Sequence, residues 1–528
     1  MKKLLSALLV MIMVFAMTTT VFASNDHAHT ITITGNAGHT YTAYQVFKGE
    51  ISGGKLTNIE WGDGVIDIEN EYEADLLSEL KKLSAYSACN SAEEVAAVLQ
   101  GFENDSDEIK AFSKLVNTWL TTTTAGTSTE NVVGGVSTYT IPVVGDGYYF
   151  VKDTGSIPQG HTNTEYILKV VSNVSIEAKD SIVTSEKKVM DKNDATGITS
   201  GWQDSADYDI GDYVPFKLSA TLPNNYENYT SYSMTFHDYE VFYGTAPNTY
   251  AGLQLVMKNT DYPFVVKVDG VAIHENLYEV DMSSNGHCTF EVKIPNVKLT
   301  SAKNNSVITV EYYSKLTADA NLGALGNTNK MHVTYTNDVY QGGEKGTTKE
   351  DAVIVFTYQA VVNKVDQKGD PLTGAEFTLE KFVANASGTK EYKGVKGEWV
   401  AISSVKNTEG TQFSFKGLDD GEYKLTESKV PSGYNEIDDI YFTVTAEHDI
   451  ESDSPALTTL TGNVATGTIN FTPNVTDGTL TKTIENRQGA TLPSTGGIGT
   501  TMFYVVGATL VLGAAVVLVT RKRMAIEN

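Results

Sequence analysis

The chain has 528 residues, of which 65 are acidic and 39 are basic, so its formal net charge is −26 at pH 7. A surface this negative repels phosphate backbones, which excludes a nucleic-acid-binding protein. With 41% hydrophobic and 10% aromatic residues, the chain can bury several cores, which excludes a disordered protein. Two cysteines, Cys89 and Cys288, and nine scattered histidines predict neither a disulfide scaffold nor a zinc site, so we expect no metal and no cofactor.

The N-terminus has the pattern of a secretory signal peptide. Lys2 and Lys3 precede an apolar run over 4–16, and the segment 21–23 reads Val-Phe-Ala, a small-residue cleavage pattern. We therefore expect a signal peptide over 1–23 and an exported mature chain. A permanent membrane anchor is the alternative, which the short run and the polar threonines after it disfavour.

The first region of the mature chain, 24–180, combines strand and helix patterns. Apolar residues alternate at Ile31 and Ile33, which predicts a strand. Apolar residues at spacings of three and four predict helices near 76–83, 95–102 and 109–119. Each helix has one apolar face, so we expect the three helices to pack on a sheet.

The second region, 181–356, and the third region, 357–487, are predicted to be β-sandwiches. Period-two apolar runs such as 214–220, 308–312 and 377–379 alternate with segments rich in Gly, Asn and Pro. Short alternating strands between turns are typical of antiparallel sandwiches of immunoglobulin-like type. The predicted fold class is therefore mainly β, with tandem immunoglobulin-like β-sandwich domains and helical insertions in the first one.

Both β-regions place charged or amide side chains in phase with buried neighbours: Lys187, Asp238 and Asn329 in the second, and Lys364, Glu427 and Asn486 in the third. An unpaired lysine or carboxylate in a sandwich core is costly, so each needs a partner. Burial lowers the pKa of a lysine and raises the pKa of a carboxyl group, which leaves a neutral amine and a neutral proton donor. A buried lysine beside an asparagine amide, with the acid shuttling protons, can expel ammonia and form a Lys–Asn isopeptide bond. Ordinary buried salt bridges are the alternative.

The C-terminus combines three signals in order. The pentapeptide Leu492-Pro493-Ser494-Thr495-Gly496 precedes an apolar stretch over 502–520 and the basic cluster 521–523. The stretch is long enough to span a bilayer, and the basic cluster would hold its end in the cytoplasm. The pentapeptide resembles the LPxTG sorting signal of Gram-positive surface proteins, which the membrane transpeptidase sortase cleaves. The resemblance implies a sorting signal over 488–528, cleavage between Thr495 and Gly496, a membrane tether that is only transient, and anchoring to peptidoglycan.

Two sets of short motifs resemble the domains of Gram-positive pilins. In the third region, Val-Asn-Lys-Val at 362–365, Leu-Thr-Gly-Ala-Glu-Phe at 372–377 and the segment 423–434 are similar to the Cna B-type domain, with Glu427 as the glutamate of its E-box. In the second region, Glu-Lys-Lys-Val at 186–189, Phe-His-Asp at 236–238 and Asn-Thr-Asn-Lys at 327–330 resemble the middle domain of SpaA/FimA-type backbone pilins.

This resemblance covers nearly the whole chain and implies two intramolecular isopeptide bonds. One joins Lys187 to Asn329 with Asp238 as the catalytic acid, and the other joins Lys364 to Asn486 with Glu427 as the catalytic acid. Lys188 and Asn337 are competing choices in the second region, where the strand phase favours Lys187.

A pilin of this family also needs an exposed lysine at the end of its first domain, which resolves the sortase acyl-enzyme of the next subunit. Here the segment 174–180 reads Val-Ser-Ile-Glu-Ala-Lys-Asp, and the alternation of its apolar residues directs Lys179 to solvent. In the family this lysine lies in a motif of the form V-x-V-Y-P-K-N, and its Tyr, Pro and Asn are replaced here by Glu177, Ala178 and Asp180. Lys169 and Lys192 are therefore reserve choices. Asp180 lies in the apolar phase, without an evident lysine partner for a bond in the first region.

We therefore expect the backbone subunit of a sortase-assembled covalent pilus, or fimbria, in which Thr495 is joined to Lys179 of the next subunit on the bacterial surface. The expected partners are sortase, identical subunits, minor pilins, peptidoglycan and a host surface ligand. A monomeric wall-anchored adhesin or an ancillary pilin at the tip or base is the alternative. Catalytic motifs are lacking, so we expect no enzyme beyond single-turnover self-cross-linking. The acidic loops at 419–420 and 438–439 are expected to be solvated rather than to bind Ca²⁺.

Overall fold

The computed structural model describes residues 27–53, 55–66, 75–103, 106–163, 165–170, 172–178, 181–240, 252–257, 259–282, 289–338, 345–405, 409–465, 470–489 and 498–524. The chain divides into two compact units. Unit 1 comprises 1–189, 213–315 and 328–353, and unit 2 comprises 190–212, 316–327 and 354–528. The predicted signal peptide, 1–23, lies outside the described residues, and the predicted domain boundaries stay a prediction.

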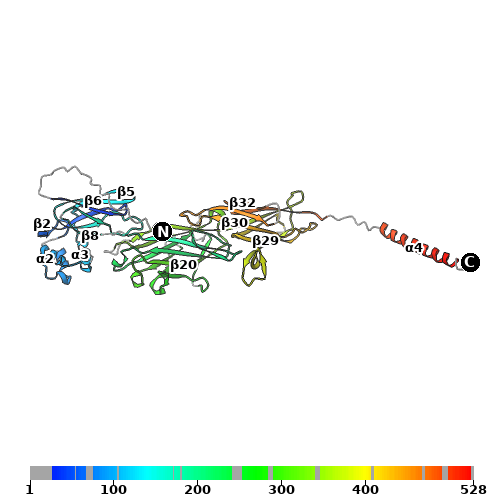
Figure 1. Cartoon of the computed structure of the whole chain (residues 1–528), viewed down its shortest axis with the longest axis horizontal. Coiled ribbons are helices and arrows are strands. Elements are labelled where there is room, and N and C mark those ends of the chain that lie inside the picture. The colour runs from blue at the N-terminus through cyan, green and yellow to red at the C-terminus, as the bar shows by residue number, and fades with distance from the viewer. Residues whose placement is uncertain are drawn as a thin grey trace, which may run out of the picture. The chain divides into compact units, whose positions relative to one another are not determined.

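The first region, drawn in blue and cyan in Figure 1, contains two sheets. One sheet has the order β5 (Thr129–Val133), β6 (Val136–Val144), β1 (Ala28–Gly35) and β9 (Val174–Glu177). The other has the order β3 (Lys55–Trp61), β2 (Tyr41–Ser52), β7 (Gly147–Asp153) and β8 (Glu165–Val170), with β4 (Gly126–Thr127) paired to β2. Alternate residues such as Ile31, Ile33, Tyr139 and Val151 form a buried core. The strand predicted at Ile31 and Ile33 is β1.

Three α-helices of this region cover the sheet that contains β2, β3 and β7: α1 (Leu76–Leu80), α2 (Ala92–Leu99) and α3 (Asp107–Thr118), with the short 3₁₀ helix η1 (Ser84–Tyr86) between the first two. Each α-helix begins at a side-chain cap, provided by Asp75, Ser91 and Ser106, which satisfies a free backbone N–H group of the first turn. Their buried side chains share one core with Phe47 and Phe150. The three predicted helices are confirmed.

The second region contributes two further sheets to unit 1. The first has the order β10 (Thr184–Asn193), β13 (Tyr213–Thr221), β20 (Val307–Leu316), β16 (Val265–Val268) and β17 (Val271–Ala272), with β15 (Leu253–Val256) paired to β20. The second has the order β21 (Asn327–Thr336), β14 (Met234–Glu240), β19 (Phe290–Ile294) and β18 (Glu279–Asp281), with β22 (Lys345–Thr347) paired to β21. Three 3₁₀ helices, η2 (Tyr226–Asn228), η3 (Glu275–Leu277) and η4 (Val297–Leu299), lie between strands.

The inner faces of these two sheets form one core. Phe290 of β19 and Tyr312 of β20 come from different sheets, and their ring centroids are 5.0 Å apart. The strand phase predicted from 214–220 and 308–312 is confirmed, because every second residue of β13 and β20 is buried.

Unit 2 contains the third region, in yellow and orange in Figure 1. One sheet has the order β28 (Gln412–Leu418), β24 (Tyr358–Asp366), β33 (Thr479–Asn486) and β32 (Thr472–Asn474). The other has the order β26 (Lys390–Tyr392), β27 (Val395–Val405), β25 (Glu376–Ala384), β29 (Gly421–Lys429), β30 (Ile440–His448) and β31 (Leu457–Val464). Their inner faces share one apolar core that includes Phe377, Phe413 and Leu425. The first and last long strands, β24 and β33, are parallel neighbours.

The remaining elements are mostly short. The strand β11 (Ile198–Gln203) is followed by β12 (Ser205–Asp207), which pairs in parallel with β23 (Asp351–Phe356), and η5 (Gly323–Leu325) is a single 3₁₀ turn.

The C-terminal helix α4 (Ile498–Met524) contains a segment, Met502–Arg523, that is long and apolar enough to cross a membrane by length and composition. Its last turn carries three basic residues, as the sequence predicts.

Candidate functional site

The first candidate site lies in the core of the third region and joins three strands. Lys364 of β24 and Asn486 of β33 come from parallel neighbours, and Glu427 of β29 comes from the facing sheet. All three side chains are buried. The Lys364 Nζ atom donates a hydrogen bond to Asn486 Oδ1 and lies 3.2 Å from the Ile484 carbonyl oxygen. The Asn486 Nδ2 atom donates to both carboxylate oxygens of Glu427, at 3.0 Å each.

The electrostatics of this site favour a neutral amine. Burial lowers the pKa of Lys364, and the Glu427 carboxylate, 3.7 Å away, offsets this lowering only in part. The Lys364 amine also contacts the Asn486 amide that it could attack. The Glu427 carboxylate lies close to both nitrogen atoms, Lys364 Nζ and Asn486 Nδ2. This arrangement can transfer an acyl group from Asn486 to Lys364.

The second candidate site lies between the two sheets of the second region. Lys187 of β10 and Asp238 of β14 are buried and form an ion pair across the core. Asn329 of β21 is also buried. Tyr312 of β20 joins them: its hydroxyl group accepts hydrogen bonds from Lys187 Nζ at 2.9 Å and Asn329 Nδ2 at 3.0 Å, and donates one to Asp238 Oδ2 at 2.7 Å.

Two features of this second site favour acid catalysis. Complete burial raises the pKa of Asp238, although Lys187 and the hydrogen-bonding neighbours oppose the rise. The carbonyl oxygen Oδ1 of Asn329 is buried and has no hydrogen-bond partner among the described residues. The raised pKa makes Asp238 a better proton donor, and the amide oxygen of Asn329 is free to accept a proton.

The competing choices of the second region lie elsewhere. The Lys188 side chain points away from the core and pairs with Glu186 at 3.1 Å. Asn337 is buried, but it follows the end of β21, where its backbone carbonyl accepts a hydrogen bond from the Asn163 N–H group. The structure thus brings Lys187, Asp238 and Asn329 to one cluster around Tyr312.

Sequence reasoning missed the part that Tyr312 plays in this cluster, because it treated the residue only as a buried member of a strand. A buried tyrosine hydroxyl group needs a hydrogen-bond partner, so a tyrosine in the same apolar phase as a buried lysine was the available signal.

A third buried lysine, Lys381 of β25, was also missed. Its Nζ atom lies 2.5 Å from Asp419 Oδ1, 2.6 Å from Asp209 Oδ2 and 3.2 Å from Asp194 Oδ2. Burial would lower the pKa of Lys381, but the three carboxylates raise it above its usual range. The lysine therefore stays charged. The expectation that the 419–420 loop is solvated is wrong for Asp419, which is buried because Lys381 neutralises it.

A second group of acids in unit 2 lies around His448. The Nε2 atom of this histidine is 3.7 Å from Asp207 Oδ1, and its Nδ1 atom is 2.7 Å from the Ser205 hydroxyl oxygen. Burial, together with the charges of Asp207 and Asp420, raises the pKa of Asp191 to about 7. The raised pKa of Asp191 makes the stability of this unit depend on pH.

The residues predicted for polymerisation lie mostly outside the described residues. This applies to the pilin lysine Lys179, to Asp180 and to the whole pentapeptide 492–496. The strand before Lys179 has the predicted alternation, because Val174 and Ile176 pack on the core of the first region while Ser175 and Glu177 are exposed. Of the reserve lysines, Lys169 lies in β8, and Lys192 is exposed and pairs with Asp194 at 2.8 Å.

Two family models match parts of the chain. The SpaA model, a prealbumin-like fold domain, matches residues 359–454. The model of the LPXTG cell wall anchor motif matches residues 485–525. The predicted sorting signal is therefore confirmed, and the chain is a surface protein anchored to the cell wall.

The T6 backbone pilin of serotype M6 Streptococcus pyogenes, a solved structure, has a modular three-domain structure and is similar over most of this chain. The match covers 88% of this chain and 100% of that one, with 19% sequence identity and a TM-score of 0.54. The chain has the fold of a Gram-positive backbone pilin. The predicted fold class, mainly β with helices in the N-terminal region, is confirmed.

A curated relative agrees with this comparison. The trypsin-resistant surface T6 protein of Streptococcus pyogenes serotype M6 is 28% identical over 294 residues. The match covers 44% of this chain and 49% of the relative, so the chain spans about half the length of the curated protein that it matches.

Proposed function

We propose that the chain is the backbone subunit of a sortase-assembled covalent pilus and that it stabilises itself with two Lys–Asn isopeptide bonds. The observation that carries this proposal is the backbone-pilin fold over 88% of a chain that also carries an LPXTG anchor motif. A wall-anchored chain with this fold needs an external sortase and identical subunits as partners.

The contacts of Lys364 support the chemistry of the first bond. The neutral amine attacks Cγ of Asn486, the new Nζ–Cγ bond forms, and the Cγ–Nδ2 bond breaks. Glu427 lies 3.7 Å from the amine and 3.0 Å from Nδ2, so it can take a proton from the attacking nitrogen and give it to the leaving one. Ammonia leaves, and no oxidant or cofactor is needed.

The contacts of Lys187 support the same reaction in the second region, with a different proton path. Asp238 contacts the amine directly, and the Tyr312 hydroxyl group contacts Asp238, Lys187 and the Asn329 amide nitrogen. Tyr312 can therefore pass a proton from Asp238 to the leaving nitrogen of Asn329. In this site Asp238 and the Tyr312 hydroxyl group together transfer the proton between the two nitrogen atoms, which Glu427 does alone in the third region.

Polymerisation requires a second, intermolecular amide. Sortase cleaves after Thr495 and holds its carbonyl carbon as a thioester, and the Lys179 amine of the next subunit attacks that carbon and releases the sortase thiol. The alternation of β9 supports Lys179, because it directs every second residue of that strand to solvent.

The test is the pattern of cell-wall extracts in denaturing gels. The wild-type chain should give a ladder of covalent polymers that resists boiling in detergent, and Lys179→Ala should leave only monomer. Lys169→Ala and Lys192→Ala are matched controls that should keep the ladder. A ladder that survives Lys179→Ala would refute this nucleophile, and a wild-type chain without any ladder would instead favour a monomeric wall-anchored adhesin or an ancillary pilin.

A further inference from the structure

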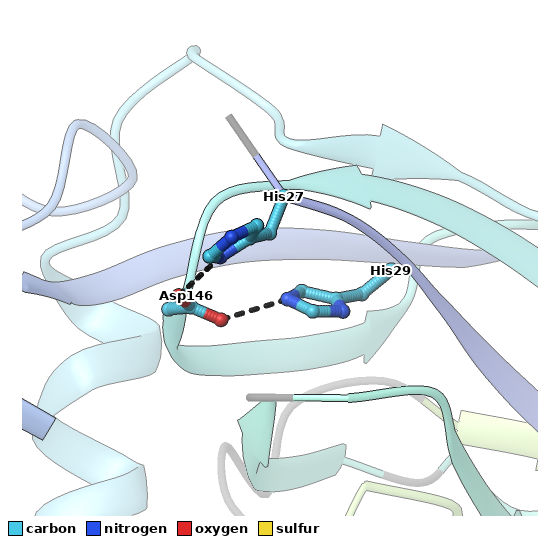
Figure 2. A group of neighbouring side chains, drawn as sticks. All are labelled: His27, His29 and Asp146. Atoms are coloured by element: carbon cyan, nitrogen blue, oxygen red, sulfur yellow. Dashed lines mark hydrogen bonds and ion pairs between the residues drawn. The ribbon is translucent and has the colours of Figure 1, made fainter. Parts of the chain in front are cut away.

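Two histidines and one aspartate meet at the start of the first strand of unit 1. His27 and His29 are two residues apart in extended chain, so their side chains point to the same side. Asp146 lies in the turn between β6 and β7, and the Gly145 N–H group donates a hydrogen bond of 2.8 Å to the His27 carbonyl oxygen. Figure 2 shows both imidazole rings turned toward the one carboxylate.

The distances between these groups suit a small metal ion. His27 Nδ1 lies 2.9 Å from Asp146 Oδ2, and His29 Nε2 lies 2.8 Å from Asp146 Oδ1. One ligand atom from each residue lies within 4.8 Å of the other two. In a tetrahedral zinc site with bonds of about 2.0–2.1 Å, ligand atoms are roughly 3.3 Å apart. A separation of the groups by a few tenths of an ångström would therefore make room for the ion.

The burial of the three side chains also suits a site that is open on one side. The Asp146 side chain is 7% exposed and that of His29 is 10% exposed, whereas that of His27 is 71% exposed. Among the described residues, the ion pairs of Asp146 are with these two imidazoles. The protein thus supplies two nitrogen ligands and one oxygen ligand from the inside, and solvent can supply a fourth ligand from the outside.

We propose that His27, His29 and Asp146 form a binding site for a divalent transition metal of the Zn²⁺ class. The ion would join the start of β1 to a turn 119 residues further along the chain. At this position the ion would help to hold the first strand in its sheet. The inference revises the expectation that the chain has no metal site, because that expectation considered the histidines as scattered residues and overlooked their spacing in one strand.

The test is calorimetric titration of the mature chain, residues 24–495, with ZnCl₂ after removal of metals by a chelator. The described side chains of α4 from 502 to 523 are all exposed, so omission of this helix removes no packing. We expect a zinc-binding step that His29→Ala and Asp146→Asn each weaken by at least about tenfold, since each loses one ligand. The matched control is His274→Ala, which removes an exposed histidine of the second region and should leave this step unchanged.

Two further measurements keep the proposal falsifiable. If His29→Ala fails to fold, His27→Ala removes the most exposed ligand and should still weaken the binding step by at least about tenfold. Co²⁺ in place of Zn²⁺ should give the visible absorption of a tetrahedral site in the wild-type chain and should lose it in His27→Ala. Zinc binding of equal affinity in wild type, His27→Ala and Asp146→Asn would overturn the proposal, as would a wild-type chain without a binding step.

Discussion

Two lysines of unit 2 are equally buried and have opposite chemistry. Lys364 and Lys381 each expose 1% of their surface, and both point into the interior of unit 2. Lys364 faces one amide and one carboxyl group, and burial lowers its pKa. Burial acts on Lys381 in the same direction, but three carboxylates outweigh it and raise the pKa of this lysine.

The comparison shows that burial alone does not make a lysine reactive. A buried amine becomes a nucleophile only when its neighbours stabilise the charged form less than desolvation destabilises it. One carboxyl group beside Lys364 leaves its pKa lowered, whereas three carboxyl groups beside Lys381 raise the pKa of that lysine. The number of carboxylates around the lysine therefore separates the proposed cross-linking site of Lys364 from the ionic site of Lys381.

The largest expected effect comes from removal of the charge of Lys381. Lys381→Met should lower the free energy of unfolding by about 3–5 kcal/mol, because it leaves the buried Asp419 and the partly buried Asp209 without their cation. Unfolding in denaturant measures this loss of stability. The intact mass should not change apart from the substitution, because Lys381 takes no part in the proposed cross-links. Lys393→Met, which breaks an exposed ion pair with Glu422, is the control and should cost at most about 1 kcal/mol. Equal stability of the Lys381 and Lys393 variants would contradict the ionic role.

The next effect concerns the site of Lys364. Glu427→Gln should prevent the bond, so the intact mass should exceed that of wild type by about 17 Da, apart from the substitution itself. Loss of a cross-link of this kind should also cost about 2–4 kcal/mol, by analogy with disulfides. Glu422→Gln, on the same strand, is the matched control because its side chain pairs with Lys393 instead. A Glu427→Gln chain that still loses ammonia would rule out the assigned acid.

A smaller effect is expected at Tyr312, the proposed proton relay, which is not itself cross-linked in the proposal. Tyr312→Phe keeps the ring and removes the hydroxyl group, so the bond in the second region should form slowly. Mass spectra of freshly made protein should then show two species about 17 Da apart. The neighbouring Tyr313, on the other face of β20, provides the control: Tyr313→Phe should give one species. Complete cross-linking in both variants would mean that Asp238 needs no relay.

The smallest effect is a dependence of stability on pH. Burial, with the charges of Asp207 and Asp420, raises the pKa of Asp191 from 3.8 to about 7, against the smaller opposing effects of His448 and the Lys192 N–H group. A carboxyl group whose pKa is raised by folding contributes stability that is complete below pH 3.8 and is lost as the pH rises through about 7. The free energy of unfolding should therefore fall from pH 5 to pH 8, and Asp191→Asn should reduce this fall by an amount of order 1 kcal/mol. A fall of the same size in both chains would exclude Asp191 as its source.

The sequence carried enough information to find Lys187 and Lys364, because alternation along a strand decides which face a residue occupies. The same argument holds for Lys381, which follows Phe377 and Leu379 in phase, yet its partners could not be found in this way. Asp194 and Asp209 are 187 and 172 residues away from it along the chain, and only the tertiary fold brings them to one lysine. Strand patterns predict burial, whereas contacts between distant segments require the fold itself.

The parallel pairing of β24 with β33 has a mechanical consequence. Lys364 and Asn486 are 122 residues apart in sequence, and a bond between them closes this whole stretch into a loop. When a fibre is pulled, tension that enters the third region along β24 would pass through the proposed bond directly to β33. The residues between Lys364 and Asn486 would then carry no tension. Without the bond, extension of this stretch would lengthen each subunit by roughly 400 Å, at about 3.3–3.6 Å per residue. The proposed bond would therefore keep the third region of each subunit from extending under tension.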